Sequence, residues 1–162
     1  MSQPLFLEAA SEQDLGALLD LERESYTHPW TPSHFRGALA AEGALFTVLR
    51  RPFQPGDPRR GIVAYGVSQI VVDELHVHNL VVRREARSQG LGRRLLGILL
   101  GLAAGRGARV ALLEVRQSNW AALQLYRAAG FEAVGLRRDY YERPREDAVL
   151  LRRPLLPALP AS

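Results

Sequence analysis

Hydrophobic positions near the start of the chain predict a short strand followed by two helices. Residues 5–8 form the apolar stretch of the strand. Ser11 and Asp14 have the spacing of a capping box, which predicts that the first helix starts just before the first leucines. Thr31 and Pro32 have the pattern of an N-cap followed by proline in the first turn, which predicts the second helix. The leucines that share one face of the first helix are Leu15, Leu18 and Leu19.

The middle of the chain has the pattern of strands. Residues 45–49 are strand-like, whereas residues 52–60 contain three prolines and a glycine and are predicted to form a surface loop. Two longer apolar runs, 62–72 and 75–82, follow this loop and are separated by only two polar residues. We expect these two runs to pair as antiparallel neighbours.

The last third of the chain predicts helices that alternate with strands. One helix follows a glycine-containing loop and ends at residues 105–107, and a second covers 119–129 with Gly130 as its C-terminal cap. The leucines on the apolar face of the first of these helices are Leu91, Leu95, Leu99 and Leu102. The remaining strands are expected at 110–115, 131–136 and 148–151. The whole order predicts an α/β or α+β fold, with a mixed, mainly antiparallel sheet of about seven strands and helices on both faces.

The size and composition are those of one globular domain. We expect it to cover residues 1–153, followed by a proline-rich, flexible tail over 154–162. There is no cysteine, which excludes disulfides, thiolate metal sites and a cysteine nucleophile. The start has no signal-peptide pattern, and the longest apolar segment, 95–104, is too short to cross a bilayer. A cytoplasmic protein without a membrane partner is therefore expected.

The charge pattern leaves two classes of partner open. The net charge is +4, and all 21 basic residues are arginine. Such a balance suits nucleic acid, but it also suits a cofactor rich in phosphate. Because the arginines are scattered in pairs along the chain, most of them are better interpreted as a solvated surface. We expect no direct nucleic-acid partner.

The segment Arg87–Arg93 has the composition of a phosphate-binding loop. It contains Gly90 and Gly92 and lies between a predicted strand and an amphipathic helix. A helix N-terminus offers unpaired N–H groups and partial positive charge, and glycines let a phosphate approach the backbone. Glycines at this place also have a purely steric explanation. The spacing excludes a P-loop and does not meet the dinucleotide-binding fingerprint.

Further along the chain, Glu114 and Tyr126 are candidates for proton transfer. Glu114 lies in the otherwise apolar run 110–115, where burial should make it more basic than an exposed carboxylate and so usable as a general base. The alternative is a partly exposed strand residue paired with Arg116 or Arg109. Tyr126 follows in the predicted helix, where ordinary core packing is the alternative to a catalytic role.

Together these residues resemble the GNAT acetyltransferase superfamily, through the Arg87-x-x-Gly90-x-Gly92 segment. More narrowly, the chain is similar to the RimI-type enzymes, which acetylate the N-terminal alanine of a small-subunit ribosomal protein. The resemblance covers roughly residues 5–153 and implies that the domain expected over residues 1–153 is a single acetyltransferase domain. The motifs that carry it occur in family order: His28-Pro29-Trp30, Asp73-Glu74, Asn79-Leu80-Val81-Val82, Gln89-Gly90-Leu91-Gly92-Arg93, Leu113-Glu114-Val115-Arg116, Ser118-Asn119, Leu125-Tyr126, Gly130-Phe131, Arg138-Asp139-Tyr140-Tyr141 and Arg145-Glu146-Asp147-Ala148.

The resemblance implies a role for each part of the site. Acetyl-CoA would be the co-substrate, with Glu114 as general base and Tyr126 as the general acid that protonates the departing thiolate. The strands that hold Val82 and Glu114 would splay apart to admit the cofactor. The residues implied in binding the cofactor are Leu80, Val81 and Val82 for the pantetheine arm and acetyl group, Arg87, Ser88, Gln89, Gly90, Leu91, Gly92 and Arg93 around the pyrophosphate, and Asn119 for the pantetheine.

The acceptor is expected to be a protein or peptide N-terminus, with Trp30 and Tyr141 lining its channel. Both aromatic side chains have core packing as their alternative. A small amine is the alternative acceptor, and a non-catalytic acyl-CoA-binding or regulatory domain is the alternative from another class. His76 and His78 share a strand face, but no third ligand is evident and no metal is expected. The sequence predicts no oligomeric state.

Overall fold

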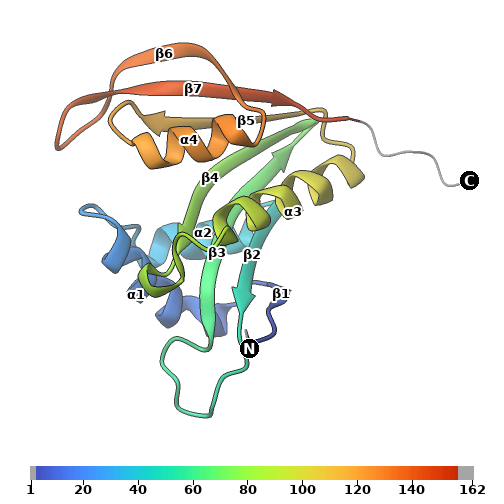
Figure 1. Cartoon of the computed structure of the whole chain (residues 1–162), viewed down its shortest axis with the longest axis vertical. Coiled ribbons are helices and arrows are strands. Elements are labelled where there is room, and N and C mark those ends of the chain that lie inside the picture. Colours follow the sequence, from blue (N-terminus) through green and yellow to red (C-terminus); the bar gives the residue numbers. More distant parts are fainter. Residues whose placement is uncertain (1–2, 157–162) are drawn as a thin grey trace, which may run out of the picture.

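A seven-stranded sheet with helices on both faces organises the chain, as Figure 1 shows for this computed structural model, which describes residues 3–156. The strand order is β1-β2-β3-β4-β5-β7-β6. Along the chain the elements are β1 (Phe6–Ala9), the 3-10 helix η1 (Glu12–Asp14), α1 (Leu15–Ser25), α2 (Pro32–Ala40), β2 (Ala44–Arg50), β3 (Ile62–Val71), β4 (Glu74–Val82), the 3-10 helix η2 (Arg84–Ala86), α3 (Leu91–Gly105), β5 (Val110–Arg116), α4 (Trp120–Ala128), β6 (Glu132–Tyr141) and β7 (Glu146–Pro154).

All neighbouring strands are antiparallel except β4 and β5. These two pair in parallel only where Glu74–His76 meets Val110–Leu112. Beyond His76 the two strands diverge, so that β1–β4 and β5–β7 form two parts of the sheet joined near one end (Figure 1). The predicted fold class and the splayed strands are confirmed.

Two hydrophobic cores lie on opposite faces of the sheet. One joins α3 and α4 to the sheet, and the other joins α1 and α2 to β2, β3 and β4. The predicted apolar face of α3 is correct for Leu91, Leu95 and Leu99, but Leu102 is 38% exposed. The buried stripe also includes Leu96 and continues past Leu99 through Leu100 and Ala103, because successive turns of 3.6 residues shift the buried positions around the helix.

The last two strands are longer than the apolar pattern predicted. The pattern placed strands at 131–136 and 148–151, whereas β6 and β7 extend well beyond these limits. Strand β6 is an edge strand, and nearly all of its residues are exposed. Its second half therefore needs no apolar face and carries charged residues, so the apolar pattern did not reveal it.

The expected tail boundary after residue 153 is wrong by at least two residues. Pro154 is the last residue of β7, and the side chain of Leu155 is buried. The Leu155 N–H also donates to the Arg109 carbonyl oxygen at 2.8 Å. The rest of the expected tail, residues 157–162, lies outside the described residues. None of the described helices is both long and apolar enough to cross a bilayer.

Asp14 closes the N-terminal end of α1 through a buried ionic cluster. Its carboxylate accepts from the Ser11 N–H at 3.0 Å and, through Oδ1, from Arg50 Nη2 and Arg60 Nε, each at 3.0 Å. Burial opposes ionisation, but the hydrogen bonds from the two arginines outweigh it and lower the pKa of Asp14. The cluster fixes the position of α1 relative to β2.

We expect Asp14→Asn to lower the free energy of unfolding by about 3 kcal/mol, because it removes the buried carboxylate that Arg50 and Arg60 share and leaves Arg50 only its ion pair with the half-exposed Glu8. A lowered pKa in the folded state contributes stability above the ordinary value of 3.8, and that contribution is lost as the pH falls below it. Urea titrations at pH 7 and pH 3 measure both effects, and the difference between variant and wild type should shrink at pH 3. The exposed Asp20→Asn serves as control, and an equal loss there would contradict the assignment.

Candidate active site

The free edge of β4 faces the place where the sheet opens. Leu80, Val81 and Val82 pair with β3 on one side, and none of them pairs with β5 on the other. A β-bulge opposite Val67 interrupts the ladder just before these residues. The backbone of this segment can therefore hydrogen-bond an extended ligand in the way that a neighbouring strand would.

The glycine-containing loop meets this edge at the start of α3. Gly90 is the N-cap of α3 and has φ 76°, a left-handed conformation that glycine adopts without strain. Ser88 and Gln89 before it and Arg93 after it are exposed, whereas the Leu91 side chain is buried in the core. Of these residues, Leu91 can therefore meet a cofactor only through its backbone.

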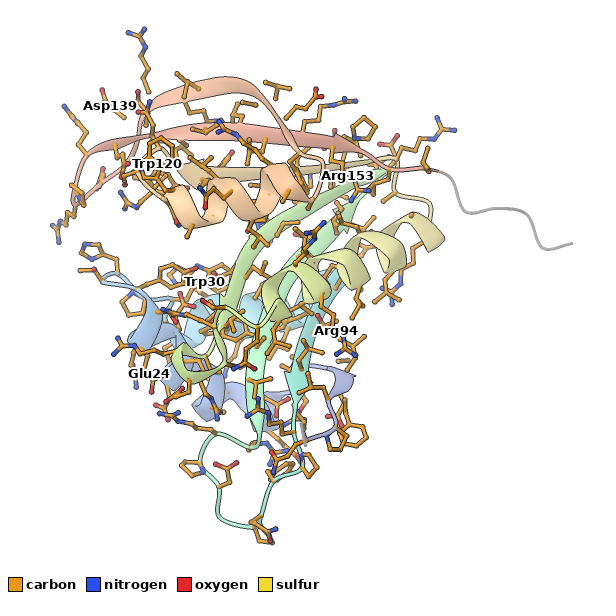
Figure 2. The ribbon with its side chains drawn as sticks, in the orientation of Figure 1. Glu24, Trp30, Arg94, Trp120, Asp139 and Arg153 are labelled. Atoms are coloured by element: carbon orange, nitrogen blue, oxygen red, sulfur yellow. The ribbon has the colours of Figure 1, made fainter. Side chains whose placement is uncertain are left out.

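Arg87 has a structural role at the same place. Its Nε donates to the Val82 carbonyl oxygen at 3.0 Å, and its Nη2 donates to Ser25 Oγ at 3.3 Å. The arginine thus joins the end of β4 to the end of α1. Its side chain is exposed even so, as are those of Arg93 and Arg94 on α3 (Figure 2 labels Arg94), and the role of Arg87 at the pyrophosphate stays a prediction.

The packing around Gly92 does not require glycine. A Cβ at this position would meet Leu125 Cδ2 and Val82 Cγ2 at 3.6 Å, which is ordinary van der Waals contact. The protein itself would therefore accept alanine. A ligand close to the first turn of α3 would explain why position 92 has no side chain. A pyrophosphate bound at the helix N-terminus is such a ligand.

Glu114 lies on β5 with its side chain 28% exposed, which agrees with the alternative of a partly exposed strand residue. Its Oε1 is 3.3 Å from Arg137 Nη1 of β6, and not beside Arg109 or Arg116. The Glu114 carboxylate also raises the pKa of Tyr140 through a hydrogen bond to its hydroxyl group. Its neighbours Leu113 and Val115 are buried on the opposite face, so Glu114 points away from the α3 core.

Tyr126 is buried on α4, with its ring edge-to-face against Phe131 at a centroid distance of 5.7 Å. Burial raises the pKa of the Tyr126 phenol, and Tyr26 and Tyr141 raise it further. Three phenols from α4, the α1–α2 loop and β6 are therefore within electrostatic reach of one another. Tyr126 keeps its proton at neutral pH and can donate it only to a strongly basic atom.

Asn119 caps α4. Its Oδ1 accepts from the Ala122 N–H at 3.2 Å, which is an ordinary N-cap bond. The side-chain Nδ2 is then the group that a cofactor could use. The next residue, Trp120, is 69% exposed and lies across the divergence of the sheet from Trp30, as the labels in Figure 2 show.

The two expected acceptor residues belong to opposite walls. Trp30 is partly buried in the α1–α2 loop, where its ring packs on Phe35 at a centroid distance of 5.3 Å. Tyr141 ends β6, and the Arg116 guanidinium lies 4.2 Å from its ring centroid. Burial first, then Tyr140 and Glu114, raise the pKa of Tyr141 to about 12.

A hollow of about 250 Å³ lies next to Trp30 on the α2 side of the sheet. Its lining includes His34, Gln69 and His78. Burial and the nearby His76 lower the pKa of His78, while Glu114 acts in the opposite direction and thus lies within electrostatic reach. Trp30 and His78 both line the hollow, whereas Glu114 is not among its lining residues.

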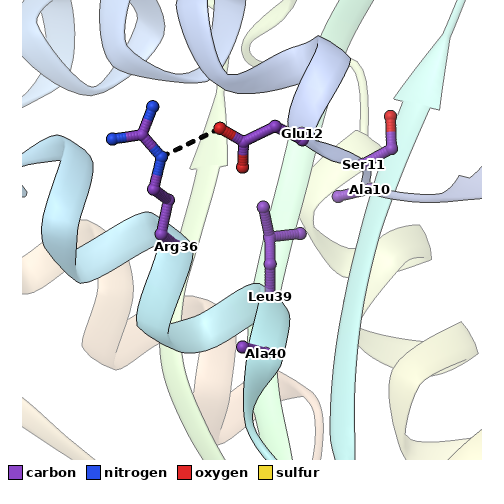
Figure 3. A pocket seen from close by; sticks show the side chains of 6 residues that line it. All are labelled: Ala10, Ser11, Glu12, Arg36, Leu39 and Ala40. Atoms are coloured by element: carbon purple, nitrogen blue, oxygen red, sulfur yellow. Dashed lines mark hydrogen bonds and ion pairs between the residues drawn. The ribbon is translucent and has the colours of Figure 1, made fainter.

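A second hollow, of about 460 Å³, is remote from these residues. It lies between residues 10–12, at the start of η1, and α2, where the Arg36–Glu12 ion pair at 2.8 Å crosses it (Figure 3). None of the expected site residues lines it. The rings of His76 and His78 stack at a centroid distance of 6.4 Å, consistent with the shared strand face that their spacing predicted. Among the described residues no group of three metal-ligating side chains is present.

Sequence reasoning assigned no role to three residues of this region: Glu22, Tyr26 and Asn79, the last of which was named only as part of a family motif. Glu22 on α1 is 1% exposed, and Asn79 on β4 is 8% exposed. Glu22 falls seven residues after Leu15, on the apolar face that was identified for α1. A charged residue on that face was the signal that could have found it.

Comparison with known proteins identifies the class. The model of the acetyltransferase (GNAT) family matches residues 15–131. The chain belongs to this family and is an acetyl-CoA-dependent N-acetyltransferase. The resemblance inferred from the motifs is confirmed, and the interpretation as a non-catalytic binding domain is set aside.

Three relatives show how far the similarity extends. The chain is 35% identical over 158 residues to the N-alpha-acetyltransferase RimI of Mycobacterium tuberculosis, covering 94% of each chain. It is 32% identical over 148 residues to a ribosomal protein bS18-alanine N-acetyltransferase of Haemophilus ducreyi, covering 90% of this chain and 97% of the relative. The crystal structure of the ribosomal-protein-S18-alanine N-acetyltransferase from Escherichia coli superposes with a TM-score of 0.83 at 32% identity, covering 98% of this chain and 99% of that one.

Proposed function

We propose that this enzyme transfers the acetyl group of acetyl-CoA to the N-terminal α-amine of a protein, with the N-terminal alanine of a bS18-type ribosomal protein as acceptor. The observation that carries this proposal is the similarity, over nearly the whole chain, to relatives named for that reaction. Two acceptor walls, around Trp30 and Tyr141, agree with a peptide that enters beside Glu114.

Glu114 is the proposed general base. With no cysteine in the chain, the amine attacks the thioester carbonyl carbon directly, and both substrates must be bound together. The amine loses one proton during this attack, and the Glu114 carboxylate accepts it, directly or through a water. An α-amine has a pKa of roughly 7.7–8.0 against about 10.4 for lysine, so a protein N-terminus needs less help from the base.

Tyr126 is the proposed general acid. When the carbon–sulfur bond of the tetrahedral species breaks, the thiolate leaves with the electron pair of that bond. The Tyr126 phenol, which is held protonated by its surroundings, donates its proton to the sulfur. The two proton transfers balance, since one proton leaves the amine and one reaches the thiolate.

We expect Gly92→Ala to weaken acetyl-CoA binding by about tenfold or more while the melting temperature stays near that of the wild type. The protein has room for the added methyl group, whereas a phosphate at the first turn of α3 does not tolerate it. Calorimetric titration with acetyl-CoA measures this effect. Gly97→Ala on the same helix, where a Cβ meets no atom within 4 Å, is the matched control and should leave affinity unchanged. Unchanged affinity in Gly92→Ala would place the pyrophosphate elsewhere.

A peptide panel tests the proposed acceptor. The purified enzyme is mixed with acetyl-CoA and one of three peptides: an alanine-initiated peptide from the bS18 N-terminus, the same peptide with a blocked N-terminus, and a peptide whose only amine is a lysine side chain. Thiol release should occur with the free alanine terminus alone. Transfer to small amines but to none of the peptides would favour the alternative acceptor.

A further inference from the structure

Glu22 is a buried carboxylate whose partners are all neutral donors. Its Oε1 accepts from the Trp30 N–H at 3.1 Å. Its Oε2 accepts from the Tyr65 hydroxyl group and from Asn79 Nδ2, the latter at 2.8 Å. A buried acid is costly unless its hydrogen bonds are satisfied, and here three donors satisfy it.

These donors come from three different parts of the site. Trp30 belongs to the α1–α2 loop, Tyr65 to β3, and Asn79 to β4 directly before the free edge at Leu80. Glu22 itself lies in the last turns of α1. One side chain therefore joins the proposed acceptor wall to the strand that presents the cofactor edge.

The network continues from Asn79 toward the proposed general acid. Asn79 Oδ1 accepts from the Tyr26 hydroxyl group at 3.0 Å. Desolvation and the Glu22 carboxylate raise the pKa of Tyr26 to about 12. Tyr26 in turn contributes to the raised pKa of Tyr126, so it lies within electrostatic reach of that phenol. Because the Glu22 carboxylate accepts, the Tyr65 hydroxyl group and Asn79 Nδ2 donate to it. Asn79 Oδ1 is then left to accept from the Tyr26 hydroxyl group.

We propose that Glu22 is a positioning residue that anchors the α1–α2 loop and thereby sets the acceptor wall, Trp30 and Tyr26, against the cofactor edge of β4. This inference rests on the proposed function, because it assigns the anchored loop to acceptor binding. Glu22 does not touch either substrate. Its effect passes through the Trp30 backbone and through Asn79.

Glutamine at position 22 cannot reproduce the network. If its oxygen accepts from Asn79 and Tyr65, its NH₂ group faces the Trp30 N–H, and the loop loses its anchor. If its oxygen accepts from Trp30, its NH₂ group faces Asn79. The Asn79 amide must then turn over, and the Tyr26 hydroxyl group must accept instead of donate. Either arrangement disturbs the acceptor wall and leaves the glycine loop unchanged.

We expect Glu22→Gln to raise KM for the alanine-initiated peptide by about tenfold, with the Kd of acetyl-CoA within about twofold of the wild type. Hydrogen exchange at the Trp30 amide should also become about tenfold faster. The control is Asp14→Asn, which removes the charge of an equally buried carboxylate at the other end of α1. It should lower the melting temperature and leave peptide KM and Trp30 exchange as in the wild type.

Two results would overturn the proposal. One is a Glu22→Gln enzyme with wild-type peptide KM and wild-type exchange at Trp30. The other is an Asp14→Asn enzyme whose peptide KM rises equally, since general loss of stability would then explain both variants. If Glu22→Gln does not fold, Glu22→Asp keeps the charge but shortens the reach and should show the same rise in exchange and KM. A wild-type enzyme that acetylates no peptide would refute the proposed acceptor, whereas the exchange comparison needs no acceptor and still decides whether Glu22 holds the loop.

Discussion

Glu114→Gln is expected to lower kcat by about 10²–10⁴-fold, the usual effect of losing a positioned base. Glutamine has nearly the same shape and can still bond to the Tyr140 hydroxyl group, but it cannot accept the proton of the amine. The ion pair with Arg137 is partly exposed, so its loss should change stability by about 1 kcal/mol or less. Steady-state kinetics with the alanine-initiated peptide measure the loss of turnover, and the Kd of acetyl-CoA shows separately whether cofactor binding has changed.

Glu132→Gln is the matched control for this variant. It makes the same change of charge on exposed β6, away from the divergence of the sheet, and should keep kcat within about twofold of the wild type. A Glu114→Gln enzyme with wild-type turnover and wild-type affinity for acetyl-CoA would show that Glu114 is not the base. His78, which lies within electrostatic reach of Glu114, would then be the next residue to substitute.

Tyr126→Phe is expected to lower kcat by about 10²-fold or more while KM for the peptide changes little. The ring keeps its edge-to-face contact with Phe131, so only the proton donor is removed. The melting temperature should therefore remain close to that of the wild type. Rapid-quench measurements of a single turnover report the chemical step directly.

Phe131→Leu provides the opposite test. It weakens the packing around Tyr126 but leaves the hydroxyl group in place, so it should lower stability by about 1–3 kcal/mol and keep most of the turnover. Normal turnover in Tyr126→Phe would return Tyr126 to a packing role. A larger loss of kcat in Phe131→Leu than in Tyr126→Phe would lead to the same conclusion.

The sequence predicted most elements of the fold because the apolar spacing and the end signals agree. Thr31 is indeed the N-cap of α2, with its hydroxyl oxygen accepting from the His34 N–H at 3.3 Å, and Gly130 has φ 92° after α4. The prediction was poorest for β6. An edge strand that is solvated on both faces has no alternation to read, and its extent follows from backbone pairing with β7.

The ion-pair partner of Glu114 shows why contacts are harder to predict than elements. Sequence neighbours pointed to Arg116 or Arg109, yet Arg137 comes from a strand two places away in the sheet. Both Arg116 and Arg137 pair with Ala148 of β7, and this register brings Arg137 across to Glu114. Register between distant strands depends on the whole fold, so no local pattern contains it.

The α1 helix gives the opposite lesson. The spacing that identified Leu15 and Leu18 as buried also places Glu22 on the same face, and the structure buries it. The sequence could have indicated a buried carboxylate there. It could not have indicated the Trp30, Tyr65 and Asn79 donors, because they come from three other segments.

The most direct test of the proposed function uses one peptide that carries both a free N-terminal alanine and an internal lysine. After reaction with acetyl-CoA, fragmentation mass spectrometry locates the added acetyl group. The account predicts a single acetyl group on the alanine α-amine, and almost none when Glu114→Gln replaces the wild-type enzyme. Acetylation of the lysine side chain, or equal acetylation by both enzymes, would contradict it.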